Sequence, residues 1–133
     1  DSNCKRWNER YRVLEQTLSS STEITLTHRK DSEKYVGSSI QFFLNNLSST
    51  QIEAVIAECR AHGVELKWFG AEKPTGYTSR HNSWRYMEQQ DLSKTDQILS
   101  KLLDMRIPLT FSVDDCQLIG EIITESVSTV SAK

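Results

Sequence analysis

A long segment between two strand-like stretches constrains this chain of 133 residues more than any other feature. Residues 64–69 and 105–111 alternate apolar with polar side chains and predict two strands. Residues 70–91, after the first stretch, show little sign of regular structure but are rich in cationic and aromatic side chains. Long loops in compact domains are usually functional or disordered, and disordered segments are poor in aromatic residues. We therefore predict an ordered loop that reaches a ligand, a partner or a neighbouring domain.

Periodic apolar side chains predict four helices and four strands. The expected strands cover residues 24–28, 35–44, 64–69 and 105–111, and the first helix covers residues 2–19. Capping boxes at Ser48–Gln51 and Ser112–Asp115 predict the starts of two further helices, and Gly63 predicts the end of the first of these two. This order predicts one domain over residues 1–133 of the α/β (α+β) class, a two-layer sandwich of about four strands with about four helices.

Several finer expectations depend on single positions. Residues 35–69 have the pattern strand, helix, strand, which usually forms a right-handed parallel crossover. Ser93, with Asp96 three positions later, predicts the N-cap of the third helix. Pro108 removes a backbone donor, so we expect its strand at a sheet edge or Pro108 itself at a bulge. Residues 126–133 are rich in Ser and Thr and predict a frayed end.

Composition excludes some classes of protein. The formal net charge of −2 argues against a general nucleic-acid binder, which would show a basic excess. No apolar run approaches the roughly 20 residues that span a bilayer, and no signal peptide is visible. The three cysteines are widely spaced and form no Cys-x-x-Cys pair, which argues against a metal or redox site. Free thiols indicate a reducing compartment, so we expect a cytoplasmic protein.

The loop over residues 70–91 carries the main candidates for chemistry. Arg80 and Arg85 could each offer a bidentate fork to a carboxylate or a phosphate. His81 could donate a hydrogen bond or move a proton, and Trp84 could stack on a ring or pack against a partner. The opposing interpretation stays open: the loop could fold onto its own domain and leave its arginines solvated.

Other residues favour plain structural roles. His62 lies in the last turn of a predicted helix, where its side chain would interact favourably with the helix dipole. Lys67 could form a Schiff base if desolvated, but a solvated strand lysine is the simpler interpretation. Asp114 and Asp115 start a helix, so dipole and cap roles are expected. The three histidines lack ligand spacing, so we predict no metal site and see no complete catalytic constellation.

An ordered series of short segments carries a family resemblance. The segments are GVELKWFG at 63–70, GYTSR at 76–80, WRY at 84–86 and DMRIPLTF at 104–111, with CKRWN at 4–8 and YVGSSIQF at 35–42. This series resembles the C-terminal region of the DegT/DnrJ/StrS family of pyridoxal-phosphate aminotransferases. The likeness implies the small domain of a type I aminotransferase fold, with the large cofactor-binding domain absent from this chain.

The resemblance also implies a site and partners. The substrate-binding residues would be Tyr77, Arg80, His81, Trp84 and Arg85, on a loop that helps complete the active site at a dimer interface. Pyridoxal phosphate would be the cofactor of the intact enzyme, and none is expected on this chain alone. The implied substrates are an amino-acid donor and a keto-sugar acceptor, and the implied assembly is a homodimer. No nucleic acid or membrane is expected as a partner.

Two other hypotheses about the function stay open. The chain could be a free-standing small α/β module that binds an anionic metabolite or a protein partner. Sheet aromatics at Phe42, Phe43, Trp68 and Phe69 could instead stack on single-stranded nucleic acid, although the charge balance counts against this.

The chain begins at Asp1 and enters a helical pattern almost at once. We therefore expect a removed leader or tag, or a piece of a longer polypeptide.

Overall fold

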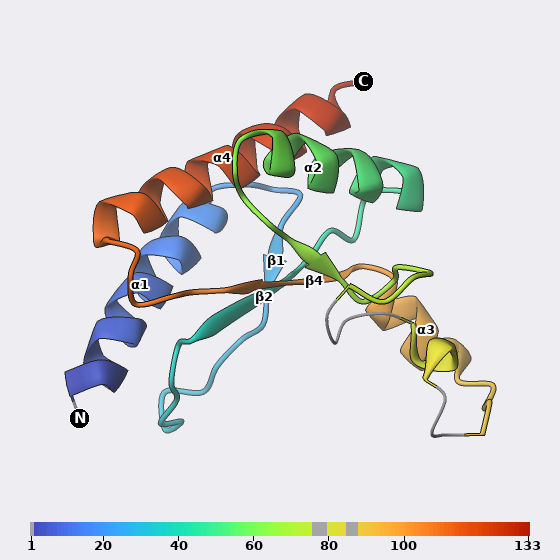
Figure 1. The fold of residues 1–133 in the computed structure, drawn as a ribbon, viewed down its shortest axis with the longest axis horizontal. Coiled ribbons are helices and arrows are strands. Elements are labelled where there is room, and N and C mark those ends of the chain that lie inside the picture. Colours follow the sequence, from blue (N-terminus) through green and yellow to red (C-terminus); the bar gives the residue numbers. More distant parts are fainter. Residues whose placement is uncertain (1, 76–79, 85–87) are drawn as a thin grey trace.

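A computed structural model of the chain describes residues 2–75, 80–84 and 88–133 (Figure 1). In chain order the elements are α1 (Ser2–Leu18), β1 (Thr25–Leu26), β2 (Ser39–Phe43), α2 (Ser49–Ala61), β3 (Lys67–Trp68), the 3-10 turn η1 (His81–Ser83), α3 (Ser93–Leu99), β4 (Leu102–Arg106) and α4 (Val113–Ser131). The predicted α+β class is confirmed: the described residues form four α-helices and a four-stranded sheet.

The sheet has the strand order β1-β2-β4-β3, and every pair of neighbours is antiparallel. Since β2 and β3 both run antiparallel to β4, they run parallel to each other. The strands of the predicted crossover therefore have the expected direction, but β4 lies between them. β4 has a neighbour on each side, so it is not the edge strand that Pro108 led us to expect.

Three helices cover one face of the sheet. α4 packs against both α1 and α2, and Figure 1 shows all three on the same side. The buried side chains of β2, β3 and β4 are Ile40, Phe42, Trp68, Leu103 and Met105. On the opposite face, Gln41 Nε2 donates a 2.6 Å hydrogen bond to Asp104. This division into a covered apolar face and a polar face is the predicted two-layer sandwich.

The segment after β4 keeps one backbone hydrogen bond beside β2, from the N–H of Ile107 to the carbonyl of Ser38 at 2.8 Å, and is held further by side chains of α1. Trp7 Nε1 donates to the carbonyl of Ile107 at 2.9 Å, and the buried Arg10 donates from Nε to the carbonyl of Phe111 at 2.6 Å. The predicted strand over residues 105–111 is therefore wrong over most of its length. Pro108 lies in this segment, where its missing N–H costs the sheet nothing.

Local capping signals fix the ends of α2 and α4. Ser48 and Gln51 form the predicted capping box of α2, and Gly63 follows that helix with φ 83°. The predicted box at Ser112–Asp115 starts α4, and its backbone hydrogen bond lowers the pKa of Asp115. The expected fraying of residues 126–133 is wrong, because α4 continues to Ser131 and buries Val130.

Candidate functional site

The long loop and α3 form a region with a different character from the rest of the chain. We call residues 71–75, 80–84 and 88–99 the loop lobe. None of these residues is buried, and Ile98 of α3 is 56% exposed. Figure 1 shows α3 standing away from the layer formed by α1, α2 and α4. Polar contacts of Arg80 and His81 connect the lobe to Gly70 and link η1 to α3.

Arg80 closes the base of the lobe. Its backbone N–H donates to the carbonyl of Ala71 at 3.1 Å, and its Nε donates to the carbonyl of Gly70 at 3.0 Å. Its Nη1 lies 3.8 Å from the carboxylate of Glu72, an exposed pair that contributes little stability. One edge of the guanidinium is therefore used inside the chain, and the terminal nitrogens are the part that an external anion could reach.

His81 joins η1 to α3. Its Nε2 lies 2.7 Å from Asp96 Oδ1, and because a carboxylate only accepts hydrogen bonds, Nε2 is the donor. The His81 side chain is only 13% exposed. Asp96 was expected to pair with Ser93 as a helix cap, and this expectation is wrong. The N-cap position is Leu92, no side chain caps α3, and Asp96 binds His81 instead.

A small apolar cavity lies beside this pair. It has a volume of about 150 Å³ and is lined by His81, Asn82, Trp84, Glu88, Gln89, Gln90, Leu92, Thr95 and Leu99. A second hollow of about 160 Å³ is lined by Phe69, Gly70, Arg80, Asn82, Asp96 and Leu99. The structure thus brings His81 and Trp84 together and places Arg80 at the adjacent hollow. Tyr77 and Arg85, the other predicted site residues, lie outside the described residues.

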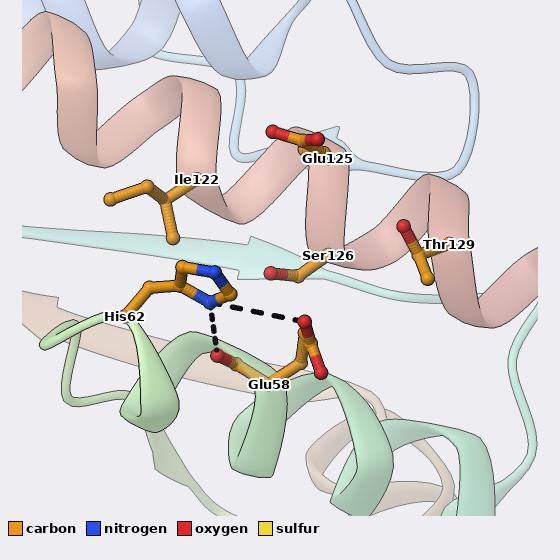
Figure 2. A pocket seen from close by; sticks show the side chains of 6 residues that line it. All are labelled: Glu58, His62, Ile122, Glu125, Ser126 and Thr129. Atoms are coloured by element: carbon orange, nitrogen blue, oxygen red, sulfur yellow. Dashed lines mark hydrogen bonds and ion pairs between the residues drawn. The ribbon is translucent and has the colours of Figure 1, made fainter.

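A separate pocket lies between α2 and α4, as Figure 2 shows. It has a volume of about 90 Å³ and is lined by Glu58, His62, Ile122, Glu125, Ser126 and Thr129. His62 is the C-cap residue of α2, and its Nδ1 lies 2.9 Å from the carbonyl of Glu58. Ser126 lowers the pKa of the Cys59 thiol, although burial raises it by more. This pocket is therefore formed by the end of α2 and by the contact between α2 and α4. None of the predicted site residues that the structure describes lines it.

The remaining candidate residues, a lysine and two buried cysteines, show no sign of a second reactive site in the part of the chain that the structure describes. Lys67 lies half-buried on β3. Burial raises the pKa of the Cys59 and Cys116 thiols, which makes both poor nucleophiles. Within the described residues, no three metal-binding side chains gather at one place, and no helix has the length and apolarity to cross a membrane.

The fold is similar to parts of two solved structures. Against an aminotransferase, TlmJ, from Streptoalloteichus hindustanus, the TM-score is 0.75 at 12% identity, covering 96% of this chain and 32% of that one. Against 3-amino-5-hydroxybenzoic acid synthase, the TM-score is 0.72 at 15% identity, covering 97% and 35%. No family model and no curated protein matches the sequence. This chain spans about a third of the length of each of the two similar structures. The family resemblance noted in the sequence is confirmed at the level of the fold.

Proposed function

We propose that this chain is the C-terminal small domain of a pyridoxal-phosphate aminotransferase of the DegT/DnrJ/StrS type. The observation that carries the proposal is the likeness of almost the whole chain to one third of an aminotransferase chain. In this proposal the other two thirds form a large domain that holds the cofactor. The domain then contributes a substrate-facing loop and contacts between domains and subunits, and it is catalytically incomplete alone.

The loop lobe supports a role at a covered surface. It carries an apolar cavity and an exposed Ile98, yet it buries none of its own described residues. Apolar surface that is gathered in one place is typical of contact or ligand sites. A large domain that packs against the lobe would cover this cavity and would give Trp84 and Leu92 an apolar neighbour.

The described residues do not by themselves suit the cofactor. Neither hollow of the lobe contains a lysine that could form a Schiff base, and Lys67 lies outside both. We therefore derive no chemical step through pyridoxal phosphate here. When bound elsewhere in the enzyme, this cofactor supplies the electron sink of transamination, and protein groups bind and orient the substrate.

The lobe residues have roles that follow from their contacts. The terminal nitrogens of Arg80, and the guanidinium of Arg85, would anchor a substrate carboxylate or another anionic group. His81 is held by Asp96 and would donate or hold a proton, while Trp84 and Tyr77 would supply ring surface. Closure of the lobe over the site would exclude water. We further propose an amino-acid donor, a keto-sugar acceptor, a homodimer and a cytoplasmic location.

The test uses the intact enzyme that contains this chain. We expect Arg80→Ala, His81→Ala and Arg85→Ala each to lower kcat/KM by roughly tenfold or more, about 1.4 kcal/mol of transition-state stabilisation. Lys94→Ala, an exposed change on α3 outside both hollows, is the matched control. Each variant is checked for an unchanged unfolding midpoint. Unchanged kcat/KM in all three would remove these residues from the site.

A cofactor test separates the chain from the intact enzyme. Pyridoxal phosphate is added to the isolated 133-residue chain, excess is dialysed away, and the visible absorption spectrum is recorded. We expect no aldimine band to survive dialysis. A retained stoichiometric band that is lost in Lys67→Gln would contradict the proposal that this chain lacks a cofactor site.

A further inference from the structure

The outer edge of β3 is open. Among the residues that the structure describes, β3 pairs only with β4, and it lies at the end of the sheet. Phe69 donates its backbone N–H to the carbonyl of Leu102 at 3.1 Å, so Phe69 and, two residues earlier, Lys67 direct their backbone groups toward β4. Because antiparallel pairing alternates, Leu66 and Trp68 direct theirs toward the open edge.

Side-chain burial extends the same alternation back along the chain. Val64, Leu66 and Trp68 are buried, whereas Glu65 is exposed and Lys67 is half-buried. This period of two indicates that residues 64–68 form one extended run. Glu65 and Lys67 therefore share the face of the sheet that carries Asp104, which is the register partner of Lys67.

Two backbone groups of this run are already used inside the chain. Val64 donates its N–H to the carbonyl of Cys59 at 2.8 Å, and the carbonyl of Trp68 accepts from Ala71 at 3.2 Å. Four backbone groups at this edge have no backbone partner among the described residues: the carbonyl of Val64, both groups of Leu66 and the N–H of Trp68. This set is self-complementary about Leu66. In an antiparallel pair centred there, the N–H of Trp68 meets the carbonyl of Val64 from the second copy.

The charges are self-complementary in the same register. Pairing two copies about Leu66 places Glu65 of each copy opposite Lys67 of the other. These are non-hydrogen-bonded positions, where opposed side chains lie closest. Lysines on edge strands often discourage pairing, but here the carboxylate stands at the matching position. Centring the pair on Val64 or Trp68 would lose both ion pairs, so the charges select one register.

The surroundings leave room for another strand. A groove of about 310 Å³ lies along this edge, between α2 and the segment after β3, and Ile56 and Ala71 contribute apolar wall. Glu65 already contacts Arg60 at 3.1 Å, but both side chains are more than half exposed. Such an exposed pair is weak and leaves Glu65 able to accept from a second cation.

We propose that β3 is a self-association edge: two copies of this chain pair antiparallel about Leu66 and join their four-stranded sheets into one. The contact is a strand addition with few residues, so it belongs to the weak, concentration-dependent class of interfaces, below about 1,200 Å² in total. This inference stands on the edge geometry alone and does not depend on the proposed function.

The test is a charge exchange measured by sedimentation velocity over a series of concentrations of the full chain. The unaltered chain is expected to show a monomer–dimer equilibrium. Glu65→Lys and Lys67→Glu are each expected to weaken the dimer by roughly tenfold or more, because each replaces two attractive pairs with two repulsive ones. A mixture of the two variants is expected to regain dimer, since their charges match. Glu121→Lys on α4 gives the same charge change away from this edge.

Three outcomes would overturn the proposal. These are a chain that stays monomeric at every concentration, a dimer that neither reversal weakens, and a mixture that associates no better than its components. Amide hydrogen exchange gives a second readout that needs no variant. The N–H groups of Leu66 and Trp68 are expected to gain protection as the concentration rises, whereas that of Glu65 is expected to change less.

Discussion

Two regions of the chain are stabilised in different ways. One is the helix-covered body, which comprises α1, α2, α4 and the four-stranded sheet, and the other is the loop lobe. The body buries a continuous apolar cluster between α1, α2, α4 and the sheet, with residues such as Leu14 and Phe42 fully buried. The lobe has no buried residue in its described part and depends on contacts such as His81–Asp96 and Arg80–Gly70. Regions with few buried apolar contacts open at low free energy. We therefore expect the body to unfold only globally and the lobe to open locally at a lower free energy.

The largest expected contrast comes from truncating one apolar side chain in each region. Phe42→Ala removes a fully buried ring from the body and is expected to lower the free energy of unfolding by about 3–5 kcal/mol. Leu92→Ala in the exposed part of the lobe is expected to change it by about 0.5 kcal/mol or less. Urea titration of both variants measures the difference. Equal losses would show that the lobe belongs to the same core.

A second change tests how tightly the body is packed. A Cβ added at Gly120 on α4 would lie 2.7 Å from the side chain of Thr17 on α1. Gly120→Ala is therefore expected to destabilise the chain by about 1–3 kcal/mol, although alanine favours helices. Ser128→Ala, an exposed change on the same helix, is the control and is expected to be close to neutral. A stabilised Gly120→Ala would mean that the two helices are more loosely packed than described.

A third change acts on the lobe alone. Asp96→Asn removes the carboxylate that holds His81, and we expect the local opening free energy of the lobe to fall by about 1 kcal/mol. Hydrogen exchange of residues 80–84 and 88–99 should rise, while the thermal midpoint of the body should stay the same. A matched fall in the midpoint would mean that the lobe and the body unfold together.

The smallest expected effect is a pH dependence at the start of α4. The backbone of Ser112 donates to the Asp115 carboxylate and lowers its pKa, so the folded chain binds this proton less well than the unfolded chain. The resulting stabilisation is present above the ordinary Asp range and is lost as the pH falls through the lowered value. Asp115→Asn should therefore be less stable than the unaltered chain at neutral pH. A difference that persists unchanged in strong acid would contradict this cause.

Strong local signals made the body largely predictable. The capping boxes at Ser48 and Ser112 and the helix end at Gly63 depend on residues within a few positions, and all three predictions are confirmed. The helical spacing of Ile98, Leu99, Leu102 and Leu103 predicts that all four belong to the third helix. This prediction is wrong for Leu102 and Leu103, which lie in β4 after α3 ends at Leu99, because short apolar runs suit a helix or a strand equally well. Pairing with β2 and β3 decided the outcome and moved β4 to Leu102–Arg106.

The contacts of the candidate site residues could not be predicted from the sequence. The unusual content of the loop singled out Arg80, His81 and Trp84, and the structure places them around two adjacent hollows. The His81–Asp96 contact spans 15 positions and has no periodic signal in the sequence. The hydrogen bond from Arg80 to the carbonyl of Gly70 was equally unpredictable from the sequence, because it depends on the conformation of the loop.

The most direct test of the central proposal is the mass of the natural polypeptide that contains this sequence. An antibody raised against the chain can capture that polypeptide from its source cells for mass spectrometry. If the chain is the small domain of an aminotransferase, the mass should be about three times the 15.3 kDa of this chain, as its share of the similar structures suggests. A mass near 15.3 kDa would contradict the proposal and favour a free-standing module that binds an anionic metabolite or a protein partner.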